Sequence, residues 1–250
     1  MKMRKLASVL LFLVTLLPGF AQSKKSPLQI SHLTDDFYVY KTFHDYKGQL
    51  ISANALYLIT NKGVVLFDAP WDESQFQPLL DSIKAKHNKQ VVMHFATHSH
   101  EDRAGGLGFY NQKGIKTYTI QLTDDILKKE NKKRAKFVIP NDTTFTVGQH
   151  TFEVFYPGKG HASDNVVVWF DKEKVLYGGC FIKSTEATDL GYLGDSDVKE
   201  WAKSIKKVQT KFKNPKYIIT GHDDWKDLNS LNHTSKLVQE YNTAKASAKK

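Results

Sequence analysis

Cysteine is nearly absent from this sequence of 250 residues, which carries it only at position 180. A single cysteine cannot form an internal disulfide, so the chain is not one of the small disulfide-stapled proteins found in oxidising compartments. Cys180 is therefore a buried apolar residue, a reactive nucleophile or a metal ligand, and its neighbours must decide among the three.

Long hydrophobic runs are also missing. The apolar run at the N-terminus, from Leu6 to Leu17, falls short of the roughly 20 residues that a membrane helix needs, and no other stretch approaches that length. Basic residues precede this run and small residues follow it: Lys2, Arg4 and Lys5, then Gly19 and Ala21. This pattern predicts a secretory signal peptide over residues 1–21. We expect a soluble mature chain that begins near Gln22, is located in the periplasm and has no membrane segment or lipid anchor.

Internal repeats, low-complexity tracts and Pro/Gly-rich linkers are absent from residues 22–250. Hydrophobic residues make up 40% of the sequence, which is enough for one sizeable core. We therefore predict one domain over residues 22–250.

The net charge is +10, and loss of the signal peptide leaves 33 basic residues against 26 acidic ones, or +7. Such an excess can indicate a nucleic-acid partner. Here the lysines are spread along the chain, and no basic tract is interleaved with aromatic residues. We expect no nucleic-acid partner, and a monomer.

Runs of β-branched and aromatic residues predict strands in both halves of the chain. These runs are 37–42, 53–60, 63–67, 91–96, 117–119, 152–156, 166–170, 175–177 and 217–220. Helical spacing of apolar residues follows Asp72 and Asp197, each placed as an N-cap, with weaker patterns after Gln121 and Asn229. The order of elements favours an α/β fold in which helices cover the outer faces of two packed sheets.

The segment from Thr97 to Gly106, directly after the run 91–96, holds two imidazoles and a carboxylate within five residues: His98, His100 and Asp102. Nitrogen and oxygen donors of this kind suit zinc. The alternative is that these are solvated side chains of an ordinary loop.

Three further candidate ligands stand at or just after the end of a predicted strand, each beside glycine: His161, Cys180 and His222. Active sites of α/β sheets favour the carboxyl ends of strands. Three histidines would form a neutral site with an open position for water, whereas a carboxylate, a thiolate and a histidine would form a more electron-rich one. A thiolate ligand would also explain the unpaired cysteine.

The stretch His98-Ser99-His100-Glu101-Asp102-Arg103, followed by His161, Cys180 and Gly221-His222, resembles the metallo-β-lactamase family. Within that family it is most similar to subclass B1, the two-zinc cysteine-containing branch, and to its exported flavobacterial members. Glyoxalase-, lactonase- and RNA-processing-type relatives typically carry histidine in place of Arg103 and a bridging aspartate near Cys180. The one-zinc subclass usually has asparagine in place of His98.

The resemblance implies a four-layer αββα sandwich of two mixed sheets flanked by helices. It assigns His98, His100 and His161 to one zinc ion, and Asp102, Cys180 and His222 to a second, with Asp102 also taking part in catalysis. A hydroxide between the metals would attack the lactam carbonyl of penicillins, cephalosporins and carbapenems, which confers antibiotic resistance.

The resemblance also implies roles for four other residues. Lys183 would bind the substrate carboxylate, and Asp68 and Arg103 would orient the ligands. Tyr192 stands where many relatives carry an asparagine that helps bind the carbonyl oxygen, so its hydroxyl takes over that role or leaves it to zinc and water. The segment 43–50 corresponds to a mobile loop over the site, with Phe43, Tyr46 and Trp71 as a possible apolar wall.

Two other functions stay open. The same metals could serve a lactonase- or glyoxalase-type hydrolase acting on an ester or thioester, or the chain could be an exported zinc-binding protein without catalysis. His94 lies inside the run 91–96 and is interpreted as a hydrogen-bonded histidine of the core rather than a further ligand.

Overall fold

The computed structural model describes residues 28–248, so the predicted signal peptide lies outside the described residues. The first part of the chain forms β1 (Gln29–Thr34), β2 (Phe37–Tyr46), β3 (Gln49–Thr60), β4 (Gly63–Phe67), α1 (Phe76–His87), β5 (Val91–Phe95), α2 (Glu101–Ala104), α3 (Leu107–Gln112), β6 (Lys116–Ile120), α4 (Gln121–Lys129) and β7 (Phe137–Ile139). The second part forms β8 (Asp142–Val147), β9 (His150–Phe155), β10 (Val167–Phe170), β11 (Val175–Gly179), α5 (Val198–Lys211), β12 (Tyr217–Thr220) and α6 (Ser230–Ser247).

The strands of residues 28–248 form two mixed sheets. The larger one has seven strands in the order β1 to β7, antiparallel from β1 to β4 and parallel from β4 to β7. The smaller one has five strands in the order β12-β11-β10-β9-β8, in which only the β11–β12 pair is parallel. Asn61-Lys62 and Asp171–Lys174 connect antiparallel neighbours, as the sequence predicts.

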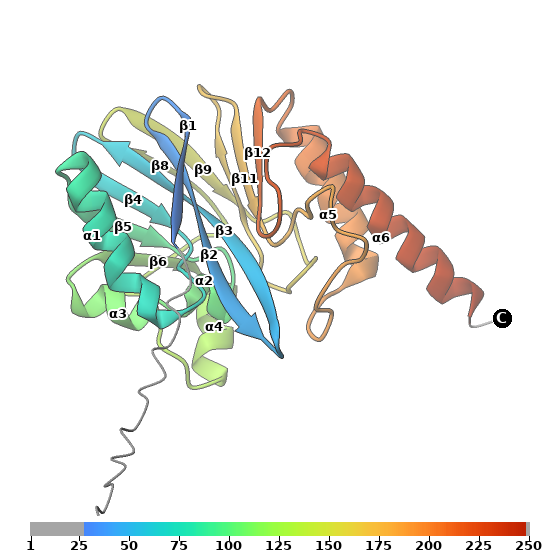
Figure 1. Ribbon diagram of the computed structural model, residues 1–250. Helices are drawn as coiled ribbons and strands as arrows, with labels where there is room; N and C mark the ends of the chain where they lie inside the picture. The colour runs from blue at the N-terminus through green and yellow to red at the C-terminus, as the bar shows by residue number, and fades with distance from the viewer. Residues whose placement is uncertain (1–27, 249–250) are drawn as a thin grey trace, which may run out of the picture.

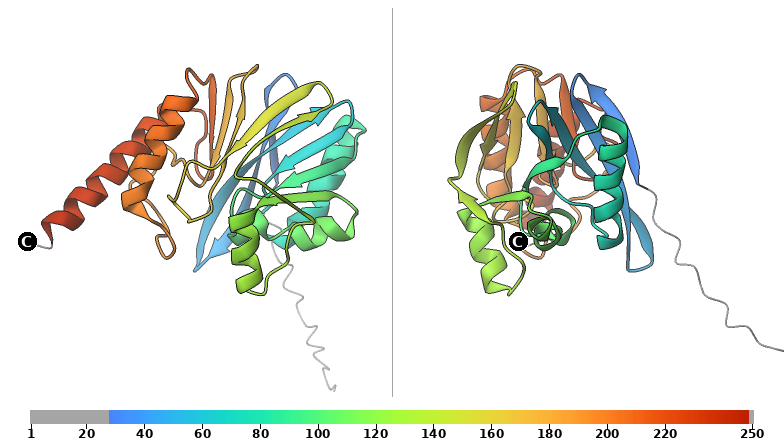
Figure 2. Two further views of the ribbon diagram at one scale, coloured as in Figure 1. Left: turned by 180° about the vertical axis from the view of Figure 1, so that it is seen from behind. Right: turned by 90° about the vertical axis from the view of Figure 1, so that its left-hand side faces the viewer.

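Alternation along the strands produces four layers. In β4, Val65 and Phe67 point into the core between the two sheets. Val64 and Leu66, on the other face of the strand, pack with apolar residues of α1. In β10, Val168 and Phe170 enter the same central core, whereas Trp169 packs toward α5 and α6. Figures 1 and 2 show α1 outside the first sheet and α5 with α6 outside the second. The four-layer sandwich is therefore confirmed.

Two aspartates start helices as the sequence predicts. Asp72 accepts a hydrogen bond from the Ser74 amide at a short 3₁₀ turn, Glu73–Gln75, that leads into α1. Asp197 accepts one from the Glu200 amide at the start of α5. Such caps satisfy amides that have no partner within the helix and contribute about 0.5–2 kcal/mol each.

The segment 43–50 is regular rather than an irregular loop. It forms the end of a β2–β3 hairpin in which Phe43 pairs with Ser52 and Tyr46 with Gln49. The turn lies at Lys47-Gly48, where both residues have positive φ. The expectation of a loop is wrong in this respect because the antiparallel pairing of β2 with β3 continues as far as Tyr46 and Gln49.

The two sheets are joined at the edge where β5, β9, β11 and β12 end. The Asn54 amide of β3 donates to the Gly221 carbonyl at 2.8 Å, and the Val166 amide donates to the Thr97 carbonyl at 2.9 Å. The Asn54 side chain adds a bond to the Thr220 carbonyl. This edge therefore brings residues from distant parts of the sequence together. Among residues 28–248, no helix has the length and apolar character needed to cross a membrane.

Candidate metal centre

The loop after β5 positions the first candidate ligands. His98 and Asp102 are almost fully buried, and His100 has an extended backbone that begins α2. The short helix α2 then turns Asp102 back toward the edge between the sheets. Three candidate ligands therefore come from one segment at the end of one strand.

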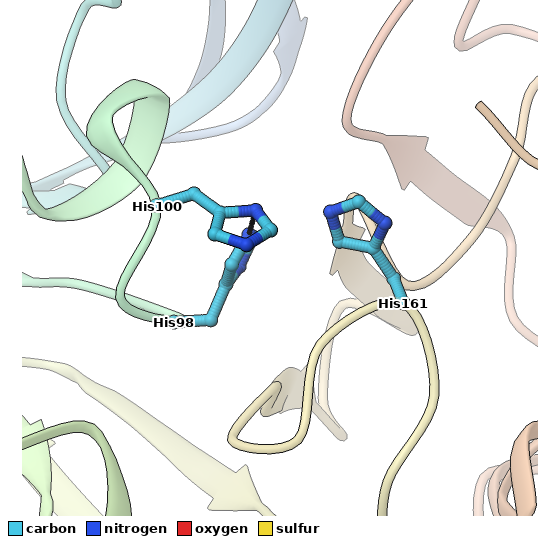
Figure 3. A group of neighbouring side chains, drawn as sticks. All are labelled: His98, His100 and His161. Carbon is cyan, nitrogen blue, oxygen red and sulfur yellow. Dashed lines mark hydrogen bonds between the residues drawn. The ribbon is translucent and has the colours of Figure 1, made fainter. Parts of the chain in front are cut away.

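His98, His100 and His161 form the first group. The His98 Nε2 and His100 Nδ1 atoms are 3.1 Å apart, and the His161 ring centre lies 5.2 and 5.1 Å from those of His98 and His100. One nitrogen from each of the three rings lies within 4.8 Å of the others. Figure 3 shows His161 facing the other two from the opposite side.

Asp102, Cys180 and His222 form a second group. The Cys180 Sγ atom lies 3.3 Å from Asp102 Oδ2 and 3.2 Å from His222 Nε2, and that nitrogen lies 3.5 Å from the carboxylate oxygen. His98 also lies within 4.8 Å of Asp102 and Cys180, so the groups adjoin. The six predicted ligands are thus brought together.

These separations fit zinc. Four ligands at about 2.0–2.3 Å in a tetrahedron are about 3.3–3.8 Å apart, close to the three distances in the second group. Nitrogen, carboxylate and thiolate donors are those that zinc prefers. The His222 Nδ1 atom is 2.6 Å from the Ser52 carbonyl, and donation to that oxygen leaves Nε2 free to bind a metal.

Glycine allows the second group to pack this closely. A Cβ at Gly221 would lie 2.5 Å from the Cys180 backbone nitrogen, which no side chain can tolerate. Gly179, at the end of β11, has φ +51°, a conformation that favours glycine. These two glycines bring Cys180 and His222 side by side.

Burial keeps three of the four histidines neutral. It lowers the pKa of His98 and His161 well below the usual value, and the pKa of His222 to about 4. A histidine binds metal only through a neutral ring. These three imidazoles are therefore ready to bind a cation at neutral pH without first losing a proton.

His100 differs because of Asp195, a residue that the sequence did not single out. Burial lowers the pKa of His100, but the Asp195 carboxylate, 2.8 Å from Nε2, outweighs burial and raises the pKa overall. The nitrogen that faces His98 is Nδ1, so Asp195 holds the ring by its other nitrogen. Carboxylates in this position orient metal-binding histidines. No local pattern marks Asp195, which lies 95 positions from its partner.

Asp102 and Cys180 respond differently to burial. Burial raises the pKa of Asp102, but Arg103 and then His222 lower it to a value below its usual range. Burial raises the pKa of the Cys180 thiol despite the nearby Arg103 guanidinium. Metal binding must therefore displace a proton from Cys180, which is the usual chemistry of thiolate ligands.

Arg103 and Asp68 lie beneath the second group. The Arg103 side chain is fully buried, and its Nε atom lies 2.8 Å from Asp102 Oδ2 and 3.2 Å from Cys180 Sγ. Asp68 accepts from the Thr97 amide at 2.7 Å, which holds the residue before His98 in place. Each predicted orienting residue thus contacts a ligand or the residue beside one.

The Lys183 ammonium group lies beside Gly191. Only 9% of Lys183 is exposed, and its ammonium group is 5.6 Å from the centre of the Trp201 ring. Burial lowers its pKa. No carboxylate of residues 28–248 forms an ion pair with it. This buried ammonium group can therefore receive an anionic group from outside the chain.

Aromatic side chains border the second group and His100. Trp71 stacks on His44 and lies 5.9 Å from Tyr46 and 6.0 Å from His222 between ring centres. Tyr192 is 60% exposed, with its ring 5.8 Å from that of His100. Trp71 therefore lies beside the second group, with Tyr46 packed against it.

His94 is fully buried, as predicted, and packs 4.6 Å from the Tyr110 ring. Neither ring nitrogen has a hydrogen-bond partner of ordinary geometry among residues 28–248, and the polar contact of the ring is with the Asp68 backbone. Burial lowers the pKa of His94 to about 3, although the Asp68 backbone raises it slightly. The ring is therefore neutral at neutral pH.

The depressed pKa of His94 predicts acid sensitivity. Between pH 6.5, the ordinary value, and about 3, the unfolded chain binds more protons than the folded one. The free energy of unfolding should therefore fall as pH falls through this range, with a contribution from His94 of up to about 1.4 kcal/mol per pH unit. Denaturant titrations of the metal-free protein and of His94→Phe check this, since the variant should have the shallower dependence. Identical slopes would contradict it.

Comparison with known proteins places the chain in one family. The model of the metallo-beta-lactamase superfamily matches residues 49–222. A metallo-beta-lactamase type 2 of Elizabethkingia meningoseptica is 48% identical over 241 residues, covering 96% of each chain. Metallo-beta-lactamase IND-1 of Chryseobacterium indologenes is 45% identical, covering 93% of this chain and 98% of its own.

Solved structures agree with the sequence comparison. The crystal structure of metallo-beta-lactamase IND-7 has a TM-score of 0.83 at 46% identity and covers 87% of this chain and 100% of its own. The structure of a metallo-beta-lactamase from Pontibacter korlensis has a TM-score of 0.82 at 31% identity. The chain belongs to the metallo-β-lactamase superfamily and, within it, to the B1 hydrolases.

Proposed function

We propose that this chain hydrolyses the amide bond of β-lactam antibiotics with the help of two zinc ions. The observation that carries the proposal is the pair of adjoining ligand groups, one of three histidines and one that includes Cys180. The relatives named metallo-beta-lactamase support the choice of substrate. Hydrolysis of this kind would confer resistance to penicillins, cephalosporins and carbapenems.

The chain supplies the ligands and binds the substrate. His98, His100 and His161 would hold one zinc ion, and Asp102, Cys180 and His222 the other. Bound zinc would provide a nucleophile from water at neutral pH and neutralise the charge that develops as the amide bond breaks.

Lys183 would bind the substrate carboxylate through a charge-assisted hydrogen bond. Tyr192, a largely exposed residue beside His100, would bind the lactam carbonyl through its hydroxyl or leave that role to zinc and water. Asp102, already a ligand, would in addition take part in catalysis by accepting a hydrogen bond from the attacking water, through a carboxylate that its low pKa keeps ionised. Asp68 and Arg103 would hold these groups in place.

The location follows from the sequence pattern of the N-terminus. Residues 1–21 would be removed on export to the periplasm, which leaves residues 22–250 as one domain. We expect this mature chain to be a monomer, without nucleic acid or membrane as partner.

The test is turnover of a chromogenic cephalosporin by the purified zinc-loaded chain, compared with turnover of a thioester. We expect hydrolysis of the lactam and little or none of the thioester, because Arg103 and Cys180 distinguish this site from that of glyoxalase-type relatives. Preference for the thioester would favour the rival hydrolase, and hydrolysis of neither would leave a zinc-binding protein.

Lys183→Ala separates substrate binding from metal binding. Loss of a hydrogen bond to a charged group should raise KM by about ten- to a hundredfold, while the zinc content per chain stays unchanged. Steady-state kinetics and metal analysis measure the two effects. Lys206→Ala, which removes an exposed lysine of α5, is the matched control. An unchanged KM in Lys183→Ala would contradict the role of this lysine.

A further inference from the structure

Beneath the second ligand group, Arg103 distributes its donors among several acceptors. Its NH2 group donates to the Gly221 carbonyl at 2.8 Å and its NH1 group to the Asn54 carbonyl at 2.7 Å, which fixes the plane of the guanidinium. The Nε atom then faces Asp102 and Cys180. The orientation of this one group therefore affects two ligands of the second site and none of the first directly.

The contact between Arg103 and Asp68 is long. The NH1 atom lies 3.4 Å from Asp68 Oδ2, although both side chains are fully buried. At this distance a direct hydrogen bond is weak. A further polar group in contact with both would strengthen the connection between the carboxylate and the guanidinium.

Tyr177 is that group. Its hydroxyl donates to Asp68 Oδ2 at 2.5 Å and accepts from Arg103 NH1 at 3.3 Å. The residue is fully buried in the middle of β11, three positions before Cys180. A hydroxyl can donate and accept at once, so this phenol connects both charged groups in a way that phenylalanine cannot.

The first ligand group is held independently. Asp68 accepts from the Thr97 amide at 2.7 Å through Oδ1 and from the Thr97 hydroxyl at 2.9 Å through Oδ2. Both bonds remain if the Tyr177 hydroxyl is lost. The connection through Thr97 to His98 therefore stays intact, while the one through Arg103 to Asp102 and Cys180 weakens.

We propose that Tyr177 is a positioning residue for the second metal ion: its hydroxyl couples Asp68 to Arg103 and so sets the orientation of Asp102 and Cys180. The inference rests on the proposed two-zinc function. It predicts that a single oxygen atom in the core adjusts the affinity of one metal site without altering the other.

Tyr177→Phe tests this with a matched control, Tyr40→Phe. Tyr40 is equally buried, and its hydroxyl also contacts Asp68, but it donates to the backbone carbonyl, at 2.7 Å, rather than to the carboxylate. Both variants lose one buried hydroxyl and keep the ring. An effect of lost stability alone should therefore occur in both.

The measurements are stepwise zinc titration against a chromophoric chelator, and the thiolate absorption band of the cobalt-substituted protein. In Tyr177→Phe we expect the dissociation constant of the second metal to rise by about ten- to a hundredfold and the thiolate band to weaken. The first metal should bind as in the parent chain, and Tyr40→Phe should leave both constants within about twofold.

Several outcomes would overturn the role of Tyr177: unchanged second-site affinity in Tyr177→Phe, equal weakening of both sites, or equal effects in the two variants. Failure of Tyr177→Phe to fold while Tyr40→Phe folds would also overturn it, by assigning Tyr177 a purely structural role. If the parent chain itself binds fewer than two zinc ions, the proposed function fails instead, and the two failures are therefore distinguishable.

Discussion

Removal of the metals with a chelator should abolish lactam hydrolysis and lower the unfolding temperature by about 5–10 °C. The first effect follows because the site contains no other nucleophile of the required kind: Cys180 is buried, and burial raises the pKa of its thiol. The second follows from linkage, since a ligand at a hundred times its dissociation constant stabilises the fold by about 2.7 kcal/mol, and each kcal/mol is about 2–4 °C at this size.

Metal binding should stabilise the contact between the two sheets, because the ligands come from both of them. His98, His100 and Asp102 follow the first sheet's β5, whereas His161, Cys180 and His222 belong to the second sheet and its loops. Bound cations would therefore join the two sheets across the edge between them. Thermal unfolding and hydrolysis, followed during chelation and after addition of zinc or magnesium, check the prediction. Zinc alone should restore both, and hydrolysis that survives complete metal removal would contradict it.

Cys180→Ser should retain one zinc ion per chain, weaken binding of the second, and lower kcat/KM by about a hundredfold or more. The hydroxyl of serine is a poor substitute for a thiolate toward zinc, while the histidine group has no contact that depends on the sulfur. Loss of one centre of electrostatic stabilisation typically costs about 10²–10³ in rate.

Metal analysis of the dialysed variant, with kinetics at low and at saturating zinc, measures both effects. Serine is close to cysteine in size, so the fold should be kept at this buried position. Thr60→Ser, which alters another buried residue, at the turn between β3 and β4, is the control. A variant that holds two zinc ions and keeps full activity would show that Cys180 is not a ligand.

The sequence predicts the buried strands well because their apolar alternation is strong. It misses β1, β7 and β8, whose side chains are largely exposed, as in Asp142–Val147 with its three threonines. It also misses α2 and α3, which are too short for a helical period to be recognised. The hydrophobic pattern thus predicts an element only where at least one whole face of that element is buried.

The candidate ligands were predictable because imidazole, carboxylate and thiol groups beside glycine at strand ends are unusual. Asp195 and Tyr177 were not, because an aspartate in a loop and a tyrosine in a core strand are ordinary residues. Their importance depends on contacts over 95 and 109 positions, to His100 and Asp68 respectively. Only the folded chain brings these partners together.

The bond between the Asn54 amide and the Gly221 carbonyl has a consequence for the order of folding. It connects an early strand to the segment that carries His222, close to the C-terminal helix, so the cation-binding pocket is completed only when nearly the entire polypeptide has assembled. Contacts of such long sequence separation form slowly. A nascent or truncated chain that ends before β12 would thus lack His222, and the second group of ligands would be incomplete.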